Sequence, residues 1–159
     1  MIRPNTQETM VGMGQALAIR APGRLWSILG SCVAVALFDP KRRVAAMAHV
    51  VLPAVGGRPG PPGKYADSAV PHLLKLLAEL GARGDGLVAK LAGGARMFGH
   101  PMPMEVGENN VLASLQALQT AGIRVAARDT GGTHGRRVTF DVAAGTLIVE
   151  VLGAKPIVL

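Results

Sequence analysis

The sequence is poor in cysteine, and it has no long apolar run. Its single cysteine, Cys32, cannot form an internal disulfide, so we expect a reducing, cytoplasmic location. No apolar stretch approaches the roughly 18 residues that cross a bilayer. The N-terminal segment, Met1 to Thr6, lacks the apolar core of a secretion signal. We therefore expect no membrane insertion.

Acidic residues are also scarce, because 10 Asp and Glu stand against 17 Lys and Arg, for a formal net charge of +7. Nucleic acid is one partner that such a charge favours. However, aromatic residues make up only 3% of the chain, too few for a base-stacking surface. The basic residues cluster only at Lys41–Arg43 and Arg136–Arg137, without a helix-turn-helix or zinc pattern. We expect no nucleic-acid partner, and the basic surface instead suits an acidic protein.

The sequence also lacks residues spaced as the ligands of a metal ion. No cluster of His, Cys and carboxylate residues has the spacing of a metal site, so neither a metal nor another cofactor is expected. With 49% hydrophobic and 17% charged residues, the chain is expected to form one compact domain over residues 1–159. Residues 1–12 and 153–159 are expected to be loose tails, although the second also suits an ordered edge.

Apolar periodicity and turn residues divide the chain into strands and two helices. Leucines at helical spacing predict an amphipathic helix that begins at Tyr65 or Asp67 and ends at Leu80, and a second stripe predicts another helix over 110–121. Strands are expected at 13–20, 25–29, 32–38, 44–52, 87–92, 123–129, 137–141 and 146–151. Because these elements do not form a regular βαβ repeat, the expected fold class is α/β. We expect mixed, largely antiparallel β-sheet layers with the two helices outside.

The central prediction is a hairpin formed by residues 32–38 and 44–52 around Asp39-Pro40-Lys41. If the turn is Pro40-Lys41, Asp39 pairs with Arg42, and Cys32 lies directly opposite His49. Opposed residues share a face, which brings the thiol close to the imidazole. A four-residue loop keeps this register, whereas a three-residue loop with a bulge sends His49 to the other face.

A thiol beside an imidazole is the pair that nucleophilic cysteine catalysis requires. Gly30 and Ser31 precede Cys32 in a small-residue turn that lets a substrate approach and frees N–H groups for an oxyanion. The alternative is a buried hydrophobic cysteine with a core histidine. His134 is a second candidate base, but it falls in a glycine-rich loop rather than on a strand.

Several ordered blocks of the sequence resemble the CheD family of chemoreceptor glutamine deamidases. Beside the hairpin, the blocks are Gly63-Lys64-Tyr65-Ala66-Asp67, Ala89-Lys90-Leu91-Ala92-Gly93-Gly94-Ala95 with Met97-Phe98, Val106-Gly107-Glu108-Asn109-Asn110-Val111, Asp129-Thr130-Gly131-Gly132 and Gly135-Arg136. The resemblance implies a Cys–His deamidase fold, which the cytotoxic necrotizing factor toxins share.

The resemblance also implies an activity and partners. Cys32 would be the nucleophile and His49 the general acid and base that convert receptor glutamine to glutamate through a thioester. Gly93 and Gly94 would leave room for the substrate backbone at the pocket. The partners would be the Glu/Gln-rich helical bundle of a chemoreceptor and a CheC-type phosphatase.

The sequence departs from the family pattern at one position of the site. The family commonly has threonine six residues before the cysteine, where this chain has Trp26. Ser27 follows and is the candidate third catalytic residue, but neighbouring strand residues point to opposite faces, so it needs a bulge or a shift. The alternative function is therefore a catalytically weak or inactive adaptor that binds chemoreceptors and a CheC-type phosphatase.

Overall fold

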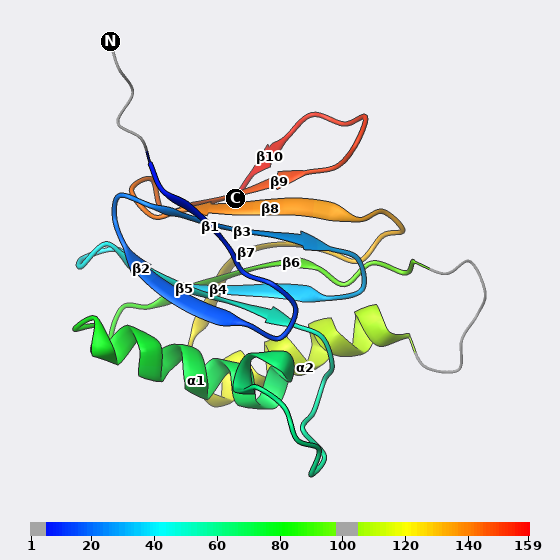
Figure 1. Ribbon diagram of the computed structural model, residues 1–159, viewed down its shortest axis with the longest axis horizontal. Coiled ribbons are helices and arrows are strands. Elements are labelled where there is room, and N and C mark those ends of the chain that lie inside the picture. The colour runs from blue at the N-terminus through cyan, green and yellow to red at the C-terminus, as the bar shows by residue number, and fades with distance from the viewer. Residues whose placement is uncertain (1–5, 98–104) are drawn as a thin grey trace.

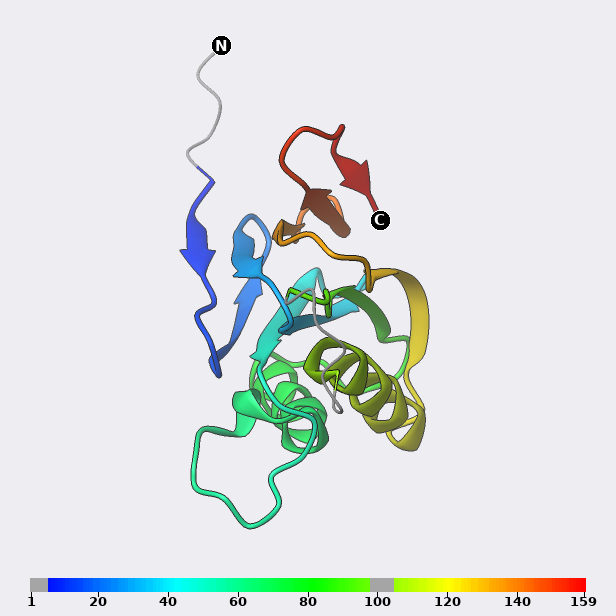
Figure 2. The same cartoon turned by 90° about the vertical axis from the view of Figure 1, so that its right-hand side faces the viewer.

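The computed structural model describes residues 6–97 and 105–159, which form three layers (Figures 1 and 2). The first sheet has the strand order β1 (Glu8–Met10), β3 (Arg24–Leu29), β8 (Arg136–Asp141), β9 (Thr146–Glu150) and β10 (Ile157–Val158). The second sheet has the order β2 (Ala16–Arg20), β5 (Val44–Val50), β4 (Val33–Asp39), β6 (Val88–Gly93) and β7 (Arg124–Thr130). Helices α1 (Ala66–Glu79) and α2 (Val106–Thr120) form the third layer, and a short 3₁₀ turn, η1 (Pro62–Lys64), precedes α1.

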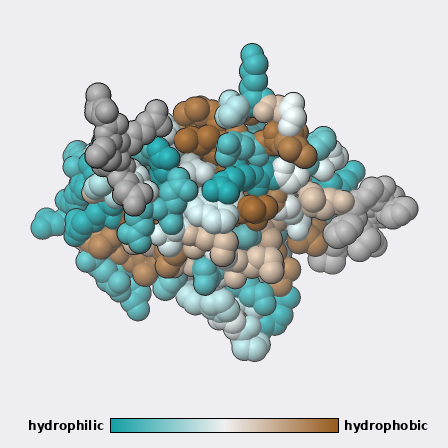
Figure 3. Space-filling model, turned by 45° about the horizontal axis from the view of Figure 1, so that its top comes forward, coloured by the Kyte–Doolittle hydropathy of each residue, from teal (hydrophilic) through white to brown (hydrophobic). Residues whose placement is uncertain are grey.

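The strand pairings confirm the expected fold class. Within each sheet one pairing is parallel, β1 with β3 and β6 with β7, and the others are antiparallel. Both helices cover the same face of the second sheet (Figure 1). No helix of the described residues covers the outer face of the first sheet, and the surface there mixes apolar and hydrophilic patches (Figure 3).

The second sheet lies between two apolar layers, which explains the nearly continuous apolar runs of β4 and β5. Along β4, Val33, Val35 and Leu37 belong to the core that includes the helices. Cys32 and the alternate residues Ala34 and Ala36 belong to the core between the two sheets. Every residue of β4 and β5 is buried as a result.

The helix predictions hold, with one boundary moved. Helix α1 begins at Ala66 and buries Leu73 and Leu77 of the leucine stripe against the sheet. Helix α2 begins at Val106 rather than at residue 110, so the helix is one turn longer at its N-terminal end than predicted. Within the described ranges, no helix is both long enough and apolar enough to cross a membrane.

The register predicted for the central hairpin is wrong, and so is the expectation that a four-residue loop would keep Cys32 opposite His49. Asp39 pairs with Val44 and His49 pairs with Ala34, so Cys32 does not lie directly opposite His49. The connection is the four residues 40–43, and Asp39 stays in the ladder because its Oδ1 accepts hydrogen bonds from the N–H groups of Lys41 (2.9 Å) and Arg42 (3.1 Å). The register moves by two residues, an even number, so Cys32 and His49 keep the same face.

Among the described residues, the expectation of a loose N-terminal tail is corrected, and the ordered edge that was the alternative for residues 153–159 is confirmed. Strand β1 pairs with β3, and Val11, which follows it, is fully buried. At the other end, β10 pairs with β9, and Leu159 exchanges two backbone hydrogen bonds with Leu147. The N-terminal strand brings Val11 into the interior, where its carbonyl contributes to the site.

Candidate active site

Cys32 lies where the chain crosses from one sheet to the other. Strand β3 of the first sheet ends at Leu29 and β4 of the second begins at Val33, so residues 30–32 form the crossing. The Cys32 side chain is 9% exposed and packs in the core between the sheets. This burial raises the pKa of the Cys32 thiol, because a thiolate loses hydration there.

His49 lies on β5 in the same layer and is 4% exposed. Continuing the observed register places Cys32 beside Val51 and diagonal to His49, and diagonal neighbours on one face of a sheet are roughly 7–8 Å apart. In the described part of the chain, no hydrogen bond joins the Cys32 thiol to the His49 ring. The thiol and the imidazole share a layer, and no hydrogen bond links them among the described residues.

The backbone carbonyl of Val11 orients the His49 imidazole. His49 Nδ1 lies 3.0 Å from the Val11 oxygen, and a carbonyl only accepts, so Nδ1 carries the hydrogen. In the neutral ring, Nε2 is then an unprotonated acceptor. Burial lowers the pKa of His49, and the hydrogen bond to Val11 opposes that shift in part. Burial therefore favours the neutral imidazole, and no described residue donates a hydrogen bond to its Nε2.

Ser27 donates to the same carbonyl. Its Oγ lies 2.7 Å from the Val11 oxygen, and the side chain is 1% exposed. The register of β3 with β8 runs unbroken from Arg24 to Leu29, so Ser27 enters the interior without a bulge. Trp26 points to the opposite face, where the guanidinium of Arg137 lies 4.2 Å from the centre of its ring. Ser27 and His49 are thus linked because both donate to the Val11 oxygen. The Ser27 side chain does not occupy the place of a side chain at position 26.

Hydrogen bonds to its carbonyl groups hold the crossing segment in place. The Gly94 N–H donates to the Cys32 oxygen (2.9 Å), and the Ala95 N–H donates to the Gly30 oxygen (3.0 Å). Asn110 donates from Nδ2 to the Ser31 oxygen (3.1 Å). These three bonds use only carbonyl groups, and no described residue accepts from the N–H groups of the segment, so those groups suit the binding of an oxyanion.

Gly93, the last residue of β6, and Gly94, which follows it, pack closely on neighbouring segments. Gly93 has φ +112°, and a Cβ there would lie 2.2 Å from the Cys32 oxygen. A Cβ on Gly94 would lie 2.4 Å from Val111 Cγ2 of α2. The chain itself fills the space beside Gly93, whereas Gly94 also lines the cavity described below, so the role of these glycines toward a substrate backbone stays a prediction.

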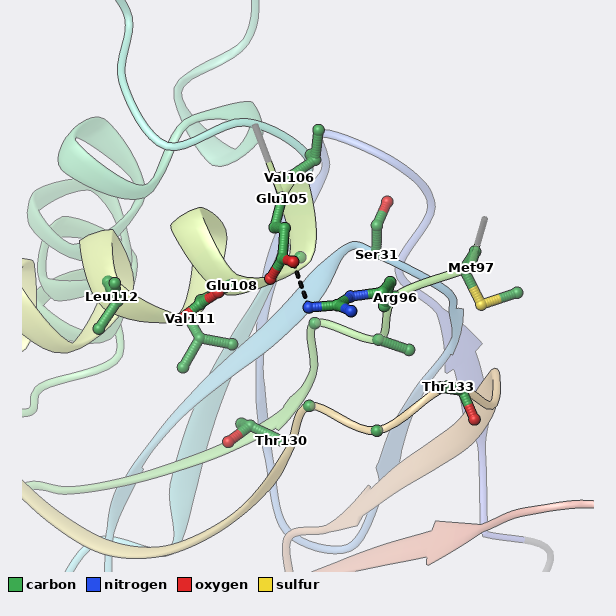
Figure 4. A pocket seen from close by; sticks show the side chains of 15 residues that line it. Ser31, Arg96, Met97, Glu105, Val106, Glu108, Val111, Leu112, Thr130 and Thr133 are labelled. Carbon is green, nitrogen blue, oxygen red and sulfur yellow. Dashed lines mark hydrogen bonds and ion pairs between the residues drawn. The ribbon is translucent and has the colours of Figure 1, made fainter. Parts of the chain in front are cut away.

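A cavity of about 630 Å³ lies beside the cysteine crossing (Figure 4). Ser31 and Gly94 contribute to its wall, whereas Gly30 and Gly93 do not. The remaining wall comes from residues 95–97, the first half of α2 and the loop after β7. Arg96 reaches across from the end of β6 to form an ion pair with Glu105 (Figure 4). This ion pair lowers the pKa of Glu105, whereas the nearby Glu105 carboxylate raises the pKa of Glu108.

Three contributors to the site were not recognised as such from the sequence. The Val11 carbonyl leaves no side-chain signal, and Asn110 is visible only within a block that resembles the family. Buried Arg136 donates to the backbone oxygens of Gly93 (2.6 Å), Asp129 (3.0 Å) and Gly131, which ties the end of β6 to the cavity wall. A pair of adjacent basic residues in the sequence does not indicate this role.

The second candidate base is placed differently. His134 is exposed, and its Nδ1 lies 3.3 Å from Oγ1 of the neighbouring Thr133. His49, by contrast, is held on a central strand and its ring is fixed by a second element. Over residues 6–97 and 105–159, no three His, Cys, Asp or Glu side chains gather into a group that could hold a metal ion.

Comparison with known proteins identifies the family. The family described as "CheD chemotactic sensory transduction" matches residues 51–151. The chemoreceptor glutamine deamidase CheD of Thermotoga maritima is 43% identical over 145 residues, which are 91% of this chain and 92% of that protein. Probable chemoreceptor glutamine deamidases of Methanococcus vannielii (43% identical, 88% of this chain and 92% of that protein) and Moorella thermoacetica (39%, 96% and 95%) are similarly close.

Among solved structures, the Bacillus licheniformis hypothetical protein YfiH matches with a TM-score of 0.48 and 15% identity. The match covers 72% of this chain and 49% of that one, a similarity too low to support an inference. The family match begins after His49, but the alignments with the relatives omit too few residues to miss the Cys32–His49 hairpin. Because the family match spans more than half of the chain and the similar relatives align over most of it, the chain belongs to the CheD family of chemotaxis proteins.

Proposed function

We propose that this chain deamidates glutamine side chains of chemoreceptors, with Cys32 as nucleophile and His49 as general acid and base. The observation that carries the proposal is the neutral His49 ring, which the Val11 carbonyl holds in the layer that contains Cys32. The relatives named as chemoreceptor glutamine deamidases supply the substrate class.

In the first step, His49 Nε2 takes the proton of the Cys32 thiol, and the sulfur attacks the carbon of the glutamine carboxamide. The carbonyl π electrons move to the oxygen, which the unused N–H groups of Ser31 and Cys32 bind. Because burial raises the pKa of Cys32 and lowers that of His49, the resting pair is a neutral thiol and imidazole. Proton transfer therefore accompanies attack on the substrate.

In the second step, the tetrahedral intermediate collapses and the C–N bond breaks. The His49 imidazolium gives its proton to the departing nitrogen, which leaves as ammonia, and a thioester to Cys32 remains. Water then gives a proton to His49 Nε2 and attacks the thioester carbon. The C–S bond breaks, His49 returns the proton to sulfur, and glutamate is the product.

Ser27 is proposed to act on His49 through the Val11 carbonyl. The hydroxyl fixes this oxygen at 2.7 Å, and the oxygen fixes the imidazole at 3.0 Å. The chain thereby keeps an oriented base although Trp26 stands where the family commonly has threonine. The orientation of the His49 ring matters because Cys32 and His49 are only diagonal neighbours. Nε2 and the thiol must come together when substrate binds, and an oriented ring needs less movement to do so.

The cavity beside Ser31 is the proposed approach of the receptor segment to the nucleophile. Its wall includes Ser31, which directly precedes Cys32, and the apolar side chains of Val106, Val111 and Leu112 on α2. A Cβ at Gly30 would lie 3.1 Å from Met97 Cγ, so the missing side chain lets Met97 approach the cysteine crossing beside this wall. A cytoplasmic location and the helical bundle of the receptor as the partner follow from the same proposal.

The second candidate function is an adaptor that binds chemoreceptors and a CheC-type phosphatase without efficient catalysis. The observation that favours it is the lack of a direct hydrogen bond between Cys32 and His49 in the described residues, together with Trp26. An adaptor needs the receptor-binding surface but no reactive thiol.

The test is intact-mass analysis of a chemoreceptor cytoplasmic fragment after incubation with the chain, beside Cys32→Ala and His49→Ala variants. The proposal predicts the mass gain of an amide-to-acid conversion with the parent chain and no gain with either variant. Receptor binding without any mass gain would favour the adaptor, and a gain with Cys32→Ala would refute the assigned nucleophile.

A further inference from the structure

Asn110 joins the two segments that carry the proposed dyad. It lies in the second turn of α2 and is fully buried. Its Nδ2 donates to the oxygen of Ser31 at 3.1 Å and to the oxygen of Val51 at 2.9 Å. Both partners are carbonyl oxygens, so the NH₂ of the side chain faces them and both of its hydrogens are used.

This contact stands where the β4–β5 ladder stops. The last backbone pair is Val33 with Val50, and the next positions along the two strands are Cys32 and Val51. Beyond that pair the chain turns away at Ser31 toward the first sheet, and the Val51 N–H donates to the Lys64 oxygen (2.8 Å). The Asn110 side chain bridges this open end of the hairpin in place of a further backbone pair.

We propose that Asn110 is a positioning residue for the reaction, which rests on the proposed function of Cys32 and His49. It holds the backbone one residue before the nucleophile and two residues after the base. The two reacting side chains are diagonal neighbours, so their separation depends on how far the strand ends open. Without the bridge, Ser31 and Val51 can separate, and a misplacement of about 1 Å in such geometry costs up to about a hundredfold in rate.

Ser114 offers a matched control on the same helix. It lies one turn after Asn110, is fully buried, and its Oγ has no hydrogen-bond partner among the described residues. Replacing Ser114 with alanine removes a buried polar atom from α2 but breaks no hydrogen bond to the described part of the cysteine crossing. The control therefore separates a general loss of helix packing from a change in the position of Cys32.

The experiment compares the chain with Asn110→Ala, Asn110→Ser and Ser114→Ala. Asn110→Ser keeps one shorter donor, so it carries the test if Asn110→Ala does not fold. Thermal unfolding establishes the folded fraction, and deamidation of a receptor fragment gives kcat and KM. We expect Asn110→Ala to lower kcat by about ten- to a hundredfold with KM within about threefold, and Ser114→Ala to change neither.

A second readout does not depend on the substrate. The rate of alkylation of Cys32 by iodoacetamide is measured across pH for the parent chain, Asn110→Ala, His49→Ala and the double variant. If Asn110 sets the distance between the thiol and His49, the alkylation rate of Asn110→Ala should show less of the pH dependence that His49 causes. The double variant should then have the same alkylation rates as His49→Ala alone.

Two results would overturn the inference. One is a loss of kcat in Asn110→Ala that Ser114→Ala reproduces, and the other is an independent, multiplicative effect of Asn110→Ala and His49→Ala on alkylation. The failure of the proposed function looks different, because the parent chain then deamidates nothing. The alkylation profiles still decide in that case whether Asn110 couples Cys32 to His49.

Discussion

Replacing Ser27 with alanine tests how the imidazole is oriented. The substitution removes one hydroxyl, which is 1% exposed and donates to the Val11 oxygen at 2.7 Å. It leaves the hydrogen bond between His49 Nδ1 and that same oxygen. If the Val11 carbonyl is what orients the ring, the ring stays oriented in the variant.

The magnitudes follow from that arrangement. A buried neutral hydrogen bond contributes about 0.5–1.5 kcal/mol, and the Val11 oxygen keeps a partner, so no further penalty for an unsatisfied group arises. For a chain of this size, each 1 kcal/mol lowers the Tm by roughly 2–4 °C. We expect a Tm loss of a few degrees and a decrease in kcat of less than about tenfold, because a group that takes part directly in proton transfer contributes about 10²–10⁴-fold.

The assay is thermal unfolding together with the rate of deamidation of a receptor fragment. Ser114→Ala is the control, since its buried hydroxyl has no described partner and its loss should leave both quantities nearly unchanged. A decrease in kcat of a hundredfold or more in folded Ser27→Ala protein would refute the reasoning. The Ser27 hydroxyl would then act in the reaction itself rather than through Val11.

Three further predictions follow. Trp26→Thr should leave the deamidation rate within about threefold, because the side chain faces away from the site; it should lower the Tm slightly, since the stacking of Arg137 is lost at a cost of about 0.5–1 kcal/mol. Gly93→Ala should lower the free energy of unfolding by about 3 kcal/mol in denaturant titrations, because the new Cβ meets the Cys32 oxygen in a left-handed backbone conformation; an unchanged midpoint would contradict this. The buried His49 has a lowered pKa, so below its ordinary value of 6.5 the unfolded chain binds a proton that the folded chain does not. Urea titrations on both sides of that pH should therefore show a decrease in stability toward acid that His49→Ala reduces.

The sequence predicted much of the fold, for physical reasons. Apolar runs bounded by turn residues located both strands of the central hairpin, and the leucine stripe located α1 almost to the residue. The short edge strands β1 and β10 were missed, because three and two residues are too few to show a period. Their formation depends on pairing with β3 and β9 rather than on local preference.

The site was only partly accessible to sequence reasoning. Cys32 and His49 share a layer as expected, but the register depended on which backbone N–H groups Asp39 binds, and a difference of two residues there moves the dyad from opposed to diagonal. The role of the Val11 carbonyl could not be predicted, because every residue has a backbone oxygen and only the pairing of the edge strand brings this one to His49.

The central claim is that glutamine hydrolysis passes through a thioester on Cys32. Hydroxylamine tests this most directly, because it intercepts a thioester and leaves a hydroxamate at the modified glutamine. Mass analysis of a receptor fragment incubated with the chain and hydroxylamine should show the hydroxamate beside glutamate, and Cys32→Ala should show neither. Glutamate formation that persists in Cys32→Ala, or that proceeds in the parent chain without any hydroxamate, would contradict the account.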